Sequence, residues 1–345
     1  MPSFPFTATF QPATRFLKYL ATPRPQKAKV MVGLDVGSTS IKAVATGMRK
    51  GGGVRPVVAY HCAPLEAGSD EHVVEAIRSA VSALALHSRV VNVGVSGQGV
   101  VMRIVELPTM KSEELKQSLP FEAQRYLPFK LEDVVIDGVS LGAAGANKHW
   151  VLIVACKKEL LDRRLTCVKQ AGLEVGVIDV DALALANGFL AVGSDTSAGT
   201  RALISVGAQM THVVILKQET LYLVRDIPWG GDKFVRSVGE QVGSEGAAVH
   251  QALAKGEASE ALRHAFKAAS EALVTELQLS FDYFENRFGQ PPEEILVSGG
   301  VGQSPAVVEA LQSHLTQRVS GWTPGQGLSG QFAIAYGLAL RTGSS

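Results

Sequence analysis

The chain has 345 residues, a formal net charge of +1 at pH 7, 46% hydrophobic residues and 19% charged residues. The chain is too long to fold around one small hydrophobic core, so two domains of ordinary size are expected. The near-neutral charge creates no overall field that would attract a nucleic acid. Its three cysteines, Cys62, Cys156 and Cys167, lack CxxC spacing. This pattern favours buried thiols in a reducing compartment over a disulfide framework or a metal site.

The N-terminal segment resembles neither a signal peptide nor a membrane anchor. No apolar run in the chain approaches the roughly 20 residues that a membrane-spanning helix requires. We expect residues 1–28 to form an arm before the first domain. Within it, ATRFLKYLA at 13–21 has the spacing of a short amphipathic turn. It would either make a weak membrane or partner contact, or be an arm that docks or stays disordered.

The stretch VMVGLDVGSTSIKAVA at 30–45 consists of an apolar run, a short polar segment and a second apolar run. This pattern predicts a β-hairpin with a polar tip. Gly37 would let backbone N–H groups converge, while Ser38 and Thr39 add hydroxyl donors. Lys42 would bring a positive charge to a bound phosphate. The stretch therefore predicts a phosphate-binding hairpin.

An acidic residue, Asp35, ends the first apolar run of this hairpin. A carboxylate in this position would hold a hydrated Mg²⁺, which keeps most of its waters and takes few protein ligands. The alternative is an ordinary hairpin whose Asp and Ser side chains satisfy the amides of the turn. The first copy of the pattern taken alone leaves both interpretations open.

A second copy of the pattern, RALISVGAQMTHVVIL, occupies residues 201–216. Three positions of the first hairpin recur 170 residues later. The aligned pairs are Asp35 with Ser205, Gly37 with Gly207, and Lys42 with His212. Such a repeat indicates internal duplication of one structural unit.

A third glycine-containing stretch, ILVSGGVGQSP at 295–305, also follows a short apolar strand. Gly299, Gly300 and Gly302 would allow a ligand to approach the backbone closely. Ser304 followed by Pro305 predicts the start of a helix. The order strand, double glycine, helix is thus expected here.

Two phosphate-type hairpins followed by this turn resemble the actin-like ATPase superfamily, which includes actin, Hsp70, sugar kinases and FtsA. Four further stretches resemble the PilM family, the cytoplasmic actin-like component of type IV pilus assembly machines. They are LPTMKSEELKQSLPFEAQRYLPFKLEDVVIDGVSLG at 107–142, VLIVACKKELLDRRLTCVKQAGLEVGVIDVDALALANGF at 151–189, RDIPWGGDKF at 225–234 and AIAYGLALR at 333–341. The resemblance covers residues 29–341, nearly the whole chain.

The resemblance implies an α/β protein with a duplicated actin-like ATPase fold, in which two domains enclose a cleft. Domain 1 would span 29–192 and domain 2 would span 200–341, with the loop GSDTSAG at 193–199 between them. A small FtsA/PilM-type subdomain would be inserted at about 60–150. In the PilM family, the groove beside this subdomain receives the N-terminal cytoplasmic peptide of a membrane partner. An apolar stripe after Ser112, interrupted by Pro120, predicts a kinked helix or two short helices there.

The resemblance also implies a nucleotide between the domains, with Asp35 holding Mg²⁺ through water. Asp181, at the start of ALALANGF, takes the place of the polar side chain that orients the attacking water, and Asp179 is the alternative. Either residue would serve equally as a plain helix N-cap. The implied ATP contacts come from both hairpins and the double-glycine turn: Asp35, Gly37, Ser38, Thr39, Lys42, Gly207, Thr211, Gly299, Gly300 and Gly302.

The sequence departs from the PilM pattern in two places. Ser205 stands where the second hairpin of the family begins with Asp, which removes one acidic contributor to the Mg²⁺ and water network. Val249 or His250 stands where a Glu that contacts the nucleoside is expected, although Lys255 is present. Because backbone amides do much of the phosphate binding, neither change excludes a nucleotide. We expect weakened binding and weak or absent hydrolysis.

The function implied by the resemblance is that of a scaffold at the inner face of the inner membrane. It would bind the N-terminal cytoplasmic peptide of a PilN-like inner-membrane protein, relay to the pilus motor ATPases, and contact no nucleic acid. A sugar or acid kinase is an alternative, for which only Asp181 is a candidate base. An FtsA-like division filament is another, disfavoured because no amphipathic helix follows Arg341. The last is a secretion-system protein of related fold, normally continued into a transmembrane helix.

Overall fold

The computed structural model describes residues 30–48, 54–66, 69–192, 199–255 and 258–342. The predicted arm at 1–28, with its amphipathic segment, lies outside the described residues, as does most of the predicted loop at 193–199. Among the helices described, none combines the length and the apolar character that crossing a membrane requires.

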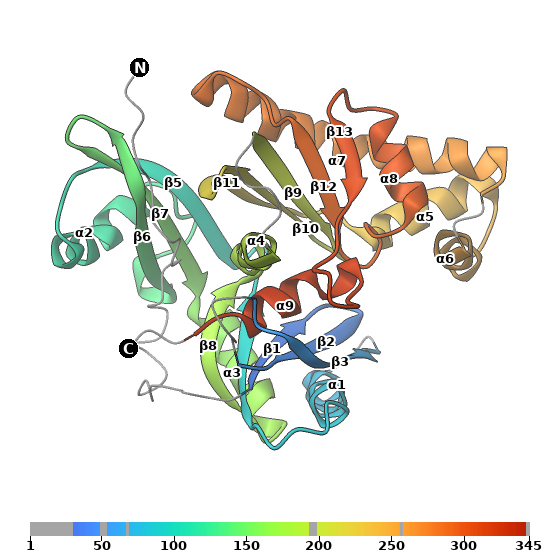
Figure 1. Ribbon diagram of the computed structural model, residues 1–345, viewed down its shortest axis with the longest axis horizontal. Coiled ribbons are helices and arrows are strands. Elements are labelled where there is room, and N and C mark those ends of the chain that lie inside the picture. Colours follow the sequence, from blue (N-terminus) through green and yellow to red (C-terminus); the bar gives the residue numbers. More distant parts are fainter. Residues whose placement is uncertain (1–29, 49–53, 67–68, 193–198, 256–257, 343–345) are drawn as a thin grey trace.

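Two five-stranded sheets of matching topology form the body of the molecule (Figure 1). The first contains β1 (Met31–Val36), β2 (Ser40–Thr46), β3 (Val57–Pro64), β4 (Val90–Val95) and β8 (Glu174–Val180). The second contains β9 (Thr200–Val206), β10 (Thr211–Lys217), β11 (Thr220–Ile227), β12 (Glu294–Ser298) and β13 (Arg318–Gly321). The strand orders β3-β2-β1-β4-β8 and β11-β10-β9-β12-β13 correspond position by position, which confirms the predicted duplication in an α/β fold.

Each sheet combines an antiparallel half with a parallel half. In the first, β1 pairs antiparallel with β2 and parallel with β4; in the second, β9 pairs antiparallel with β10 and parallel with β12. The central strands are almost wholly buried, as in Thr211–Lys217, where only the last residue is partly exposed. Continuous apolar runs are expected where both faces of a sheet are covered.

Helices cover the outer faces of both sheets (Figure 1). On the first sheet these are α1 (Asp70–Ser82) and α3 (Lys158–Gln170). On the second they are α5 (Gly231–Val242), α7 (Glu260–Phe288) and α8 (Pro305–Gln312), with α6 (Gly246–Lys255) packed beside α5 and α8. Polar residues crowd the outer sides of these helices, whereas Phe266, Leu273 and Phe284 of α7 are buried.

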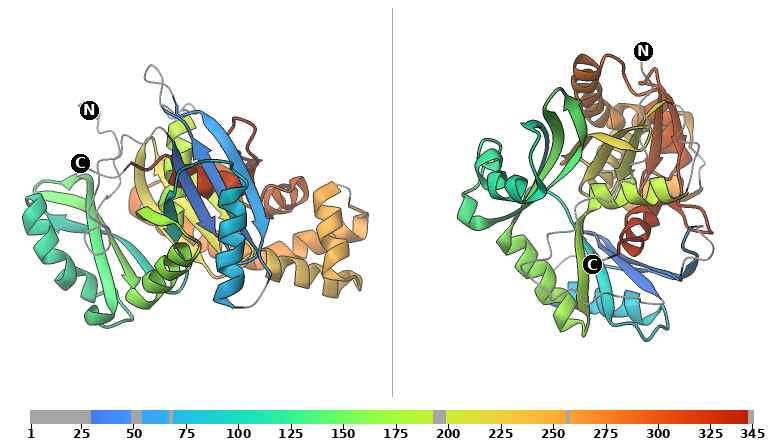
Figure 2. Two further views of the ribbon diagram at one scale, coloured as in Figure 1. Left: turned by 90° about the horizontal axis from the view of Figure 1, so that it is seen from below. Right: turned by 60° about the vertical axis from the view of Figure 1, so that its left-hand side comes forward.

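Two helices lie between the sheets. α4 (Asp181–Val192) packs on β10 of the second sheet, and α9 (Ala333–Ala339) packs on β1 of the first; the right-hand view of Figure 2 shows the pair stacked between them. The helices approach closely because Gly337 has no side chain: a Cβ there would lie 1.8 Å from the carbonyl oxygen of Ala184. Leu34 of the first sheet and Leu203 of the second consequently belong to one hydrophobic core.

Polar groups of the first domain satisfy the C-terminal end of α9. The side-chain amide of Asn92 donates to the carbonyl oxygens of Leu338 and Arg341, each at 2.9 Å. The Arg341 guanidinium lies 2.7 Å from the buried carboxylate of Asp179. The Asn92 bonds satisfy carbonyls at the helix end, where no partner within the helix is available. Together with the ion pair to Asp179 of β8, they tie the chain following α9 to the first sheet.

A third sheet stands apart, at the left of Figure 1. It consists of β5 (Val100–Pro108), β7 (Lys148–Lys157) and β6 (Val134–Gly145), in that order, and α2 (Ser112–Gln124) covers it. α2 continues through Pro120 as one helix rather than the two short helices considered above, with Leu119 and Ala123 buried on either side. A separate small core holds this unit together: Val105, Leu107, Leu115, Leu119, Ala123, Val151 and Ile153.

The small sheet differs in extent from the predicted insertion at about 60–150. Its strands run from residue 100 to residue 157. The preceding strands β3 and β4 pair with β2 and β1, and so belong to the first sheet. Sequence periodicity could not show this difference, because it identifies a strand without identifying its partners.

The small sheet docks against the end of α7. The guanidinium of Arg287 lies 4.6 Å from the ring centroid of Trp150 and 3.6 Å from the carboxylate of Glu106. The rings of Trp150 and Phe288 pack edge to face, with centroids 5.6 Å apart. A stacked cation and an aromatic pair of this kind each stabilise a contact by about 0.5–1.5 kcal/mol, so the small sheet is braced on the second domain.

The free cysteines include the buried Cys156 and Cys167 and the half-buried Cys62, in line with the expected thiols. Burial raises the pKa of the Cys156 thiol to about 12. The thiolate is the reactive form of cysteine, so burial lowers the reactivity of Cys156 at neutral pH.

We expect Gly337→Ala to destabilise the fold. Alanine favours a helix over glycine by about 1 kcal/mol, but the new Cβ would collide with the backbone of Ala184, and overpacking costs about 1–3 kcal/mol or more. The collision outweighs the gain because the obstacle is backbone on a second helix, which no rotamer change can move. Urea denaturation should therefore show a lower free energy of unfolding.

The matched control is Gly321→Ala, where an added Cβ meets nothing within 4 Å. It should change stability by less than about 0.5 kcal/mol. Equal stabilities of the two variants would show that α4 and α9 can move apart without a loss in the free energy of unfolding.

Candidate functional site

A cleft with a volume of about 840 Å³ opens between the two sheets, with the turns of both hairpins in its wall. It is also bordered by the end of β12, the start of α4 and one side of α3. The structure brings most of the predicted site residues to this wall: Asp35, Gly37, Ser38, Thr39, Lys42, Asp181, Gly207, Gly299 and Gly300.

Other predicted residues lie outside the wall of the cleft. Thr211 is fully buried, and its hydroxyl donates to the carbonyl oxygen of Trp229 at 2.8 Å, so it supports the second hairpin from below. Gly302 packs against its own turn, because a Cβ there would lie 2.1 Å from the carbonyl oxygen of Ser298. Asp179, the alternative to Asp181, is held by Arg341 away from the wall.

The helix expected to contact the nucleoside is also displaced from the cleft. Val249 of α6 is buried in the core of the second domain, and neither His250 nor Lys255 borders the cleft. A helix does follow α5 at this place in the chain, and its packing against α5 and α8 determines where it lies.

In the first hairpin, Asp35 and Lys42 stand opposite each other in the β1–β2 register. Their side chains form an ion pair, with Lys42 Nζ 3.4 Å from Asp35 Oδ2. The turn is narrow at Gly37, where a Cβ would lie 2.9 Å from the carbonyl oxygen of Ser40 and 3.2 Å from Lys42 Nζ. A side chain at this position would fill the space beside the lysine that a bound phosphate needs.

In the second hairpin, His212 stands opposite Ser205 in the β9–β10 register. His212 Nδ1 lies 2.7 Å from Asp226 Oδ1, and both side chains are largely buried. Burial alone would lower the pKa of His212, but the charge and hydrogen bond of Asp226, with Asp181 and Asp35 farther off, raise it to about 9. Burial acts to raise the pKa of Asp226, yet the histidine brings it below its ordinary value. The pair is therefore an imidazolium and a carboxylate at neutral pH.

Asp226 also connects the two halves of the molecule. Its second oxygen, Oδ2, accepts a hydrogen bond from the backbone N–H of Gly97 at 3.1 Å. Gly97 lies in the turn between β4 and β5, so this bond crosses from the second sheet to the first. A carboxylate that accepts from both a histidine and a backbone amide has a closely defined orientation.

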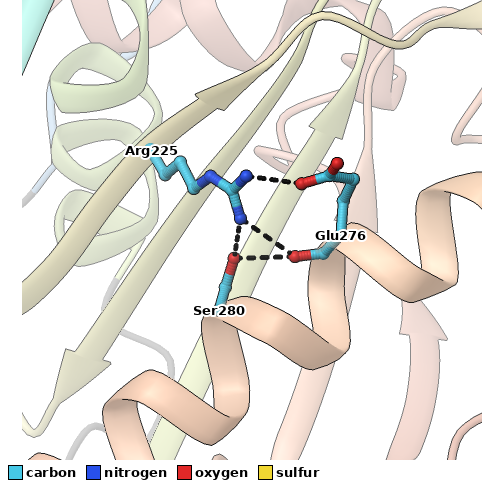
Figure 3. A network of polar contacts seen from close by, with 3 residues as sticks. All are labelled: Arg225, Glu276 and Ser280. Carbon is cyan, nitrogen blue, oxygen red and sulfur yellow. Dashed lines mark hydrogen bonds and ion pairs between the residues drawn. The ribbon is translucent and has the colours of Figure 1, made fainter.

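The neighbouring residue on β11 explains why this strand is firmly placed. Arg225 points to the opposite side of the strand and binds α7 (Figure 3). Its guanidinium donates to the Ser280 hydroxyl at 2.9 Å and to the Glu276 carbonyl oxygen at 3.1 Å, and it also pairs with the Glu276 carboxylate. Because adjacent strand residues point to opposite faces, the same strand directs Asp226 away from α7 and toward His212.

Asp181 begins α4 and points toward the first sheet. Glycine is needed opposite it, since a Cβ at Gly94 would lie 1.8 Å from Asp181 Oδ1. That oxygen has no hydrogen-bond partner within the described residues. Burial raises the pKa of Asp181 to about 6, with His212 acting against the rise and Asp35 adding to it. A buried carboxylate oxygen without a donor is a position where a ligand or water would be stabilised.

Basic side chains surround the phosphate-sized part of the cleft. Besides Lys42 and His212, the wall includes Arg164 of α3 and Lys233 and Arg236 of α5. Arg164 donates to the carbonyl oxygen of Val36, and its burial lowers the pKa of the guanidinium. Together with the narrow glycine turns, these cations fit the phosphate chain of a nucleotide.

The same residues do not fit a protein-held Mg²⁺. Asp35 already pairs with Lys42, the second hairpin offers Ser205 in place of a carboxylate, and the imidazolium of His212 adds positive charge. No group of three or more potential metal-ligating side chains occurs in the part of the chain that the structure describes. Mg²⁺ is usually held by one or two carboxylates besides water and substrate phosphates, and of the carboxylates in the two hairpins one is paired and the other is replaced by Ser205.

Sequence reasoning aligned His212 with Lys42 but assigned it no role, and it did not consider Asp226. The signal available was the repeat itself, which placed a second basic residue at the lysine position. Asp226 gave no comparable signal, because its pairing with His212 depends on the registration of β10 with β11.

The His212–Asp226 pair predicts a specific pH dependence of stability. A histidine whose pKa is raised from 6.5 to about 9 on folding contributes stability that is fully present below pH 6.5 and is lost as the pH rises through 9. With about 1.4 kcal/mol per pKa unit, the free energy of unfolding should fall by as much as about 3 kcal/mol across this interval.

Urea denaturation at pH 6 to 9.5 measures this loss. The control is the double variant His212→Gln/Asp226→Asn, which keeps a hydrogen bond but has no charge to titrate, and whose profile should be flatter. Parallel profiles for the wild type and the double variant would contradict the assignment of the charged pair.

Comparison with known proteins gives the family. The model of the family described as type IV pilus assembly protein PilM matches residues 33–343. The solved PilM-PilN type IV pilus biogenesis complex has a chain with TM-score 0.80 and 21% identity, covering 91% of this chain and 99% of that one.

Two more distant solved structures share the fold. A ROK family glucokinase from Streptomyces griseus, in complex with glucose and AMPPNP, has TM-score 0.53 and 16% identity over 90% of this chain and 98% of that one. The ethanolamine utilization protein EutJ from Carboxydothermus hydrogenoformans has TM-score 0.52 and 13% identity over 94% and 93%. These likenesses confirm the predicted actin-like fold. Because the family model spans nearly all of it, the chain belongs to the type IV pilus assembly protein PilM family.

Proposed function

We propose that this protein is a cytoplasmic scaffold of a type IV pilus assembly machine, located at the inner face of the inner membrane. It binds the N-terminal cytoplasmic peptide of a PilN-like inner-membrane protein, and this contact holds it at the membrane. The observation that carries the proposal is the match to the PilM family over 33–343. The solved relative in complex with PilN supports the choice of partner. The scaffold would also relay between this membrane protein and the pilus motor ATPases.

The small sheet with α2 is the proposed peptide-binding region. Two aromatic side chains are exposed here, Phe121 on α2 at 73% and Tyr126 in the turn after α2 at 38%. Exposed aromatic residues on a rigid element are effective anchors for a peptide, because they bury a large area at a small cost in conformational entropy. The docking of this sheet on α7 through Arg287 and Trp150 would keep the region rigid.

Fluorescence anisotropy with a labelled synthetic peptide, the N-terminal cytoplasmic segment of the cognate PilN-like protein, tests this proposal. We expect saturable binding that Phe121→Ala weakens at least about fivefold, roughly 1 kcal/mol. The matched control is Leu279→Ala, which removes another exposed apolar side chain, on α7 and outside the small sheet. A loss confined to the Leu279 variant would place the peptide on the second domain, and absence of binding by the wild type would contradict the scaffold proposal.

We also propose that the cleft binds ATP, which makes the scaffold responsive to nucleotide. The narrow turns at Gly37 and Gly207 and the cations of the wall support this. Of the residues predicted from the resemblance, those that line the cleft are the proposed contacts, whereas Thr211 and Gly302 would act by supporting the turns. Hydrolysis is weak or absent, since a single carboxylate, Asp181, is available to orient a water molecule.

Isothermal titration with ATP tests the nucleotide site. Lys42→Gln should weaken binding about tenfold, or about 1.4 kcal/mol, because it removes a charge next to the phosphates. Lys217→Gln, at the far end of β10 and outside the cleft, should leave binding unchanged. Turnover in the ordinary enzymatic range of about 1 s⁻¹ or more, abolished by Asp181→Asn, would overturn the scaffold in favour of a kinase or ATPase.

A further inference from the structure

We propose that His212, oriented by Asp226, takes the place of the divalent cation, so that the cleft binds the phosphate chain of a nucleotide without Mg²⁺. The inference rests on the nucleotide binding proposed above and specifies how the charge of the phosphates is neutralised. It assigns the second hairpin a function that replaces the carboxylate it lacks.

The two hairpins present their cations symmetrically. Lys42 stands opposite Asp35 in the first hairpin, and His212 stands opposite Ser205 in the second. Both cationic side chains border the cleft. A phosphate chain lying between the hairpin turns would therefore meet one positive side chain from each domain.

The orientation of the imidazole leaves one nitrogen for a ligand. Nδ1 is held by the Asp226 carboxylate at 2.7 Å. Nε2 has no hydrogen-bond partner among the residues that the structure describes, and His212 borders the cleft. With both ring nitrogens protonated, the Nε2–H group is a donor for a phosphate oxygen.

Asp226 acts as the positioning residue. Because its other oxygen accepts from the backbone of Gly97 at 3.1 Å, the carboxylate cannot rotate freely to another partner. Arg225, next in the chain, ties the same strand to Glu276 and Ser280 of α7 (Figure 3). The imidazole is therefore held from behind by a carboxylate that is itself fixed from two directions.

Cations engage two of the three carboxylates that face His212. The groups that face it are Asp226 from β11, Asp181 from α4, and Asp35 with its partner Lys42 from the first hairpin. Arg164 of α3 also borders this part of the cleft. Since Asp226 is engaged by His212 and Asp35 by Lys42, Asp181 is the one carboxylate of this group that no cation engages, which is little to compensate Mg²⁺. His212 is only 5% exposed, so water screens its charge poorly.

Isothermal titration of the full chain with ATP, once in excess EDTA and once in excess Mg²⁺, tests the inference. We expect dissociation constants for the wild type that agree within about threefold. In EDTA, His212→Gln/Asp226→Asn should bind at least about tenfold more weakly, while His212→Lys, which restores the charge, should return within about threefold of the wild type. His264→Gln, an exposed histidine on α7, is the matched control and should have no effect.

A further variant tests whether putting back the missing carboxylate makes ATP binding depend on Mg²⁺. Ser205→Asp restores the carboxylate that the second hairpin lacks, so its ATP binding should become at least about fivefold stronger with Mg²⁺ than with EDTA. Thermal melting followed by circular dichroism shows whether each variant is folded. If the double variant fails to fold, two measurements still test whether His212 replaces the metal. They are the affinity of the wild type with and without Mg²⁺, and the affinity of the Ser205→Asp variant under the same two conditions.

The possible outcomes distinguish a failure of this inference from a failure of the proposed ATP site. Binding of ATP by the wild type only in the presence of Mg²⁺ would overturn the inference and leave the nucleotide site intact. Unchanged metal-free binding by a folded double variant would remove His212 from the site. No binding under either condition would overturn the nucleotide site itself, and this inference with it.

Discussion

The close crossing of α4 and α9 is the constraint on which the arrangement of the molecule depends. The helices form the middle of the structure, one packed on each sheet, and their separation is set by the absence of a side chain at Gly337. Because α4 begins at Asp181, the same crossing determines how far that carboxylate lies from the two hairpins. The core and the cleft are thus positioned by a single helix contact.

The second domain also supports the small sheet. α7 binds β11 through Arg225 (Figure 3). It binds the small sheet through its own Arg287, whose guanidinium lies over the ring of Trp150. β11 in turn carries Asp226, whose oxygens meet the second hairpin and the turn at Gly97. The proposed nucleotide cleft and the proposed peptide region therefore depend on the same two elements, β11 and α7.

The electrostatics of the cleft follow from one replacement. Where the first hairpin pairs Asp35 with Lys42, the second pairs Ser205 with His212. A histidine without a carboxylate across the hairpin needs another counter-charge when buried. Asp226 on the adjacent strand supplies it, and the pKa of His212 rises to about 9 although burial acts against the rise. The two hairpins thus share their backbone geometry but differ in the charges of the side chains that face the cleft.

The sequence by itself determined the two hairpins and the duplication, because alternating apolar runs and polar turns are local patterns. That Asp35 and Asp181 border one cleft was implied by the family resemblance. The sequence also indicated the family, through motifs in a definite order. Only the tertiary structure decided that β3 and β4 join the first sheet, that α6 lies away from the cleft, and that Asp226 pairs with both His212 and Gly97. These depend on packing between distant segments, which no local pattern encodes.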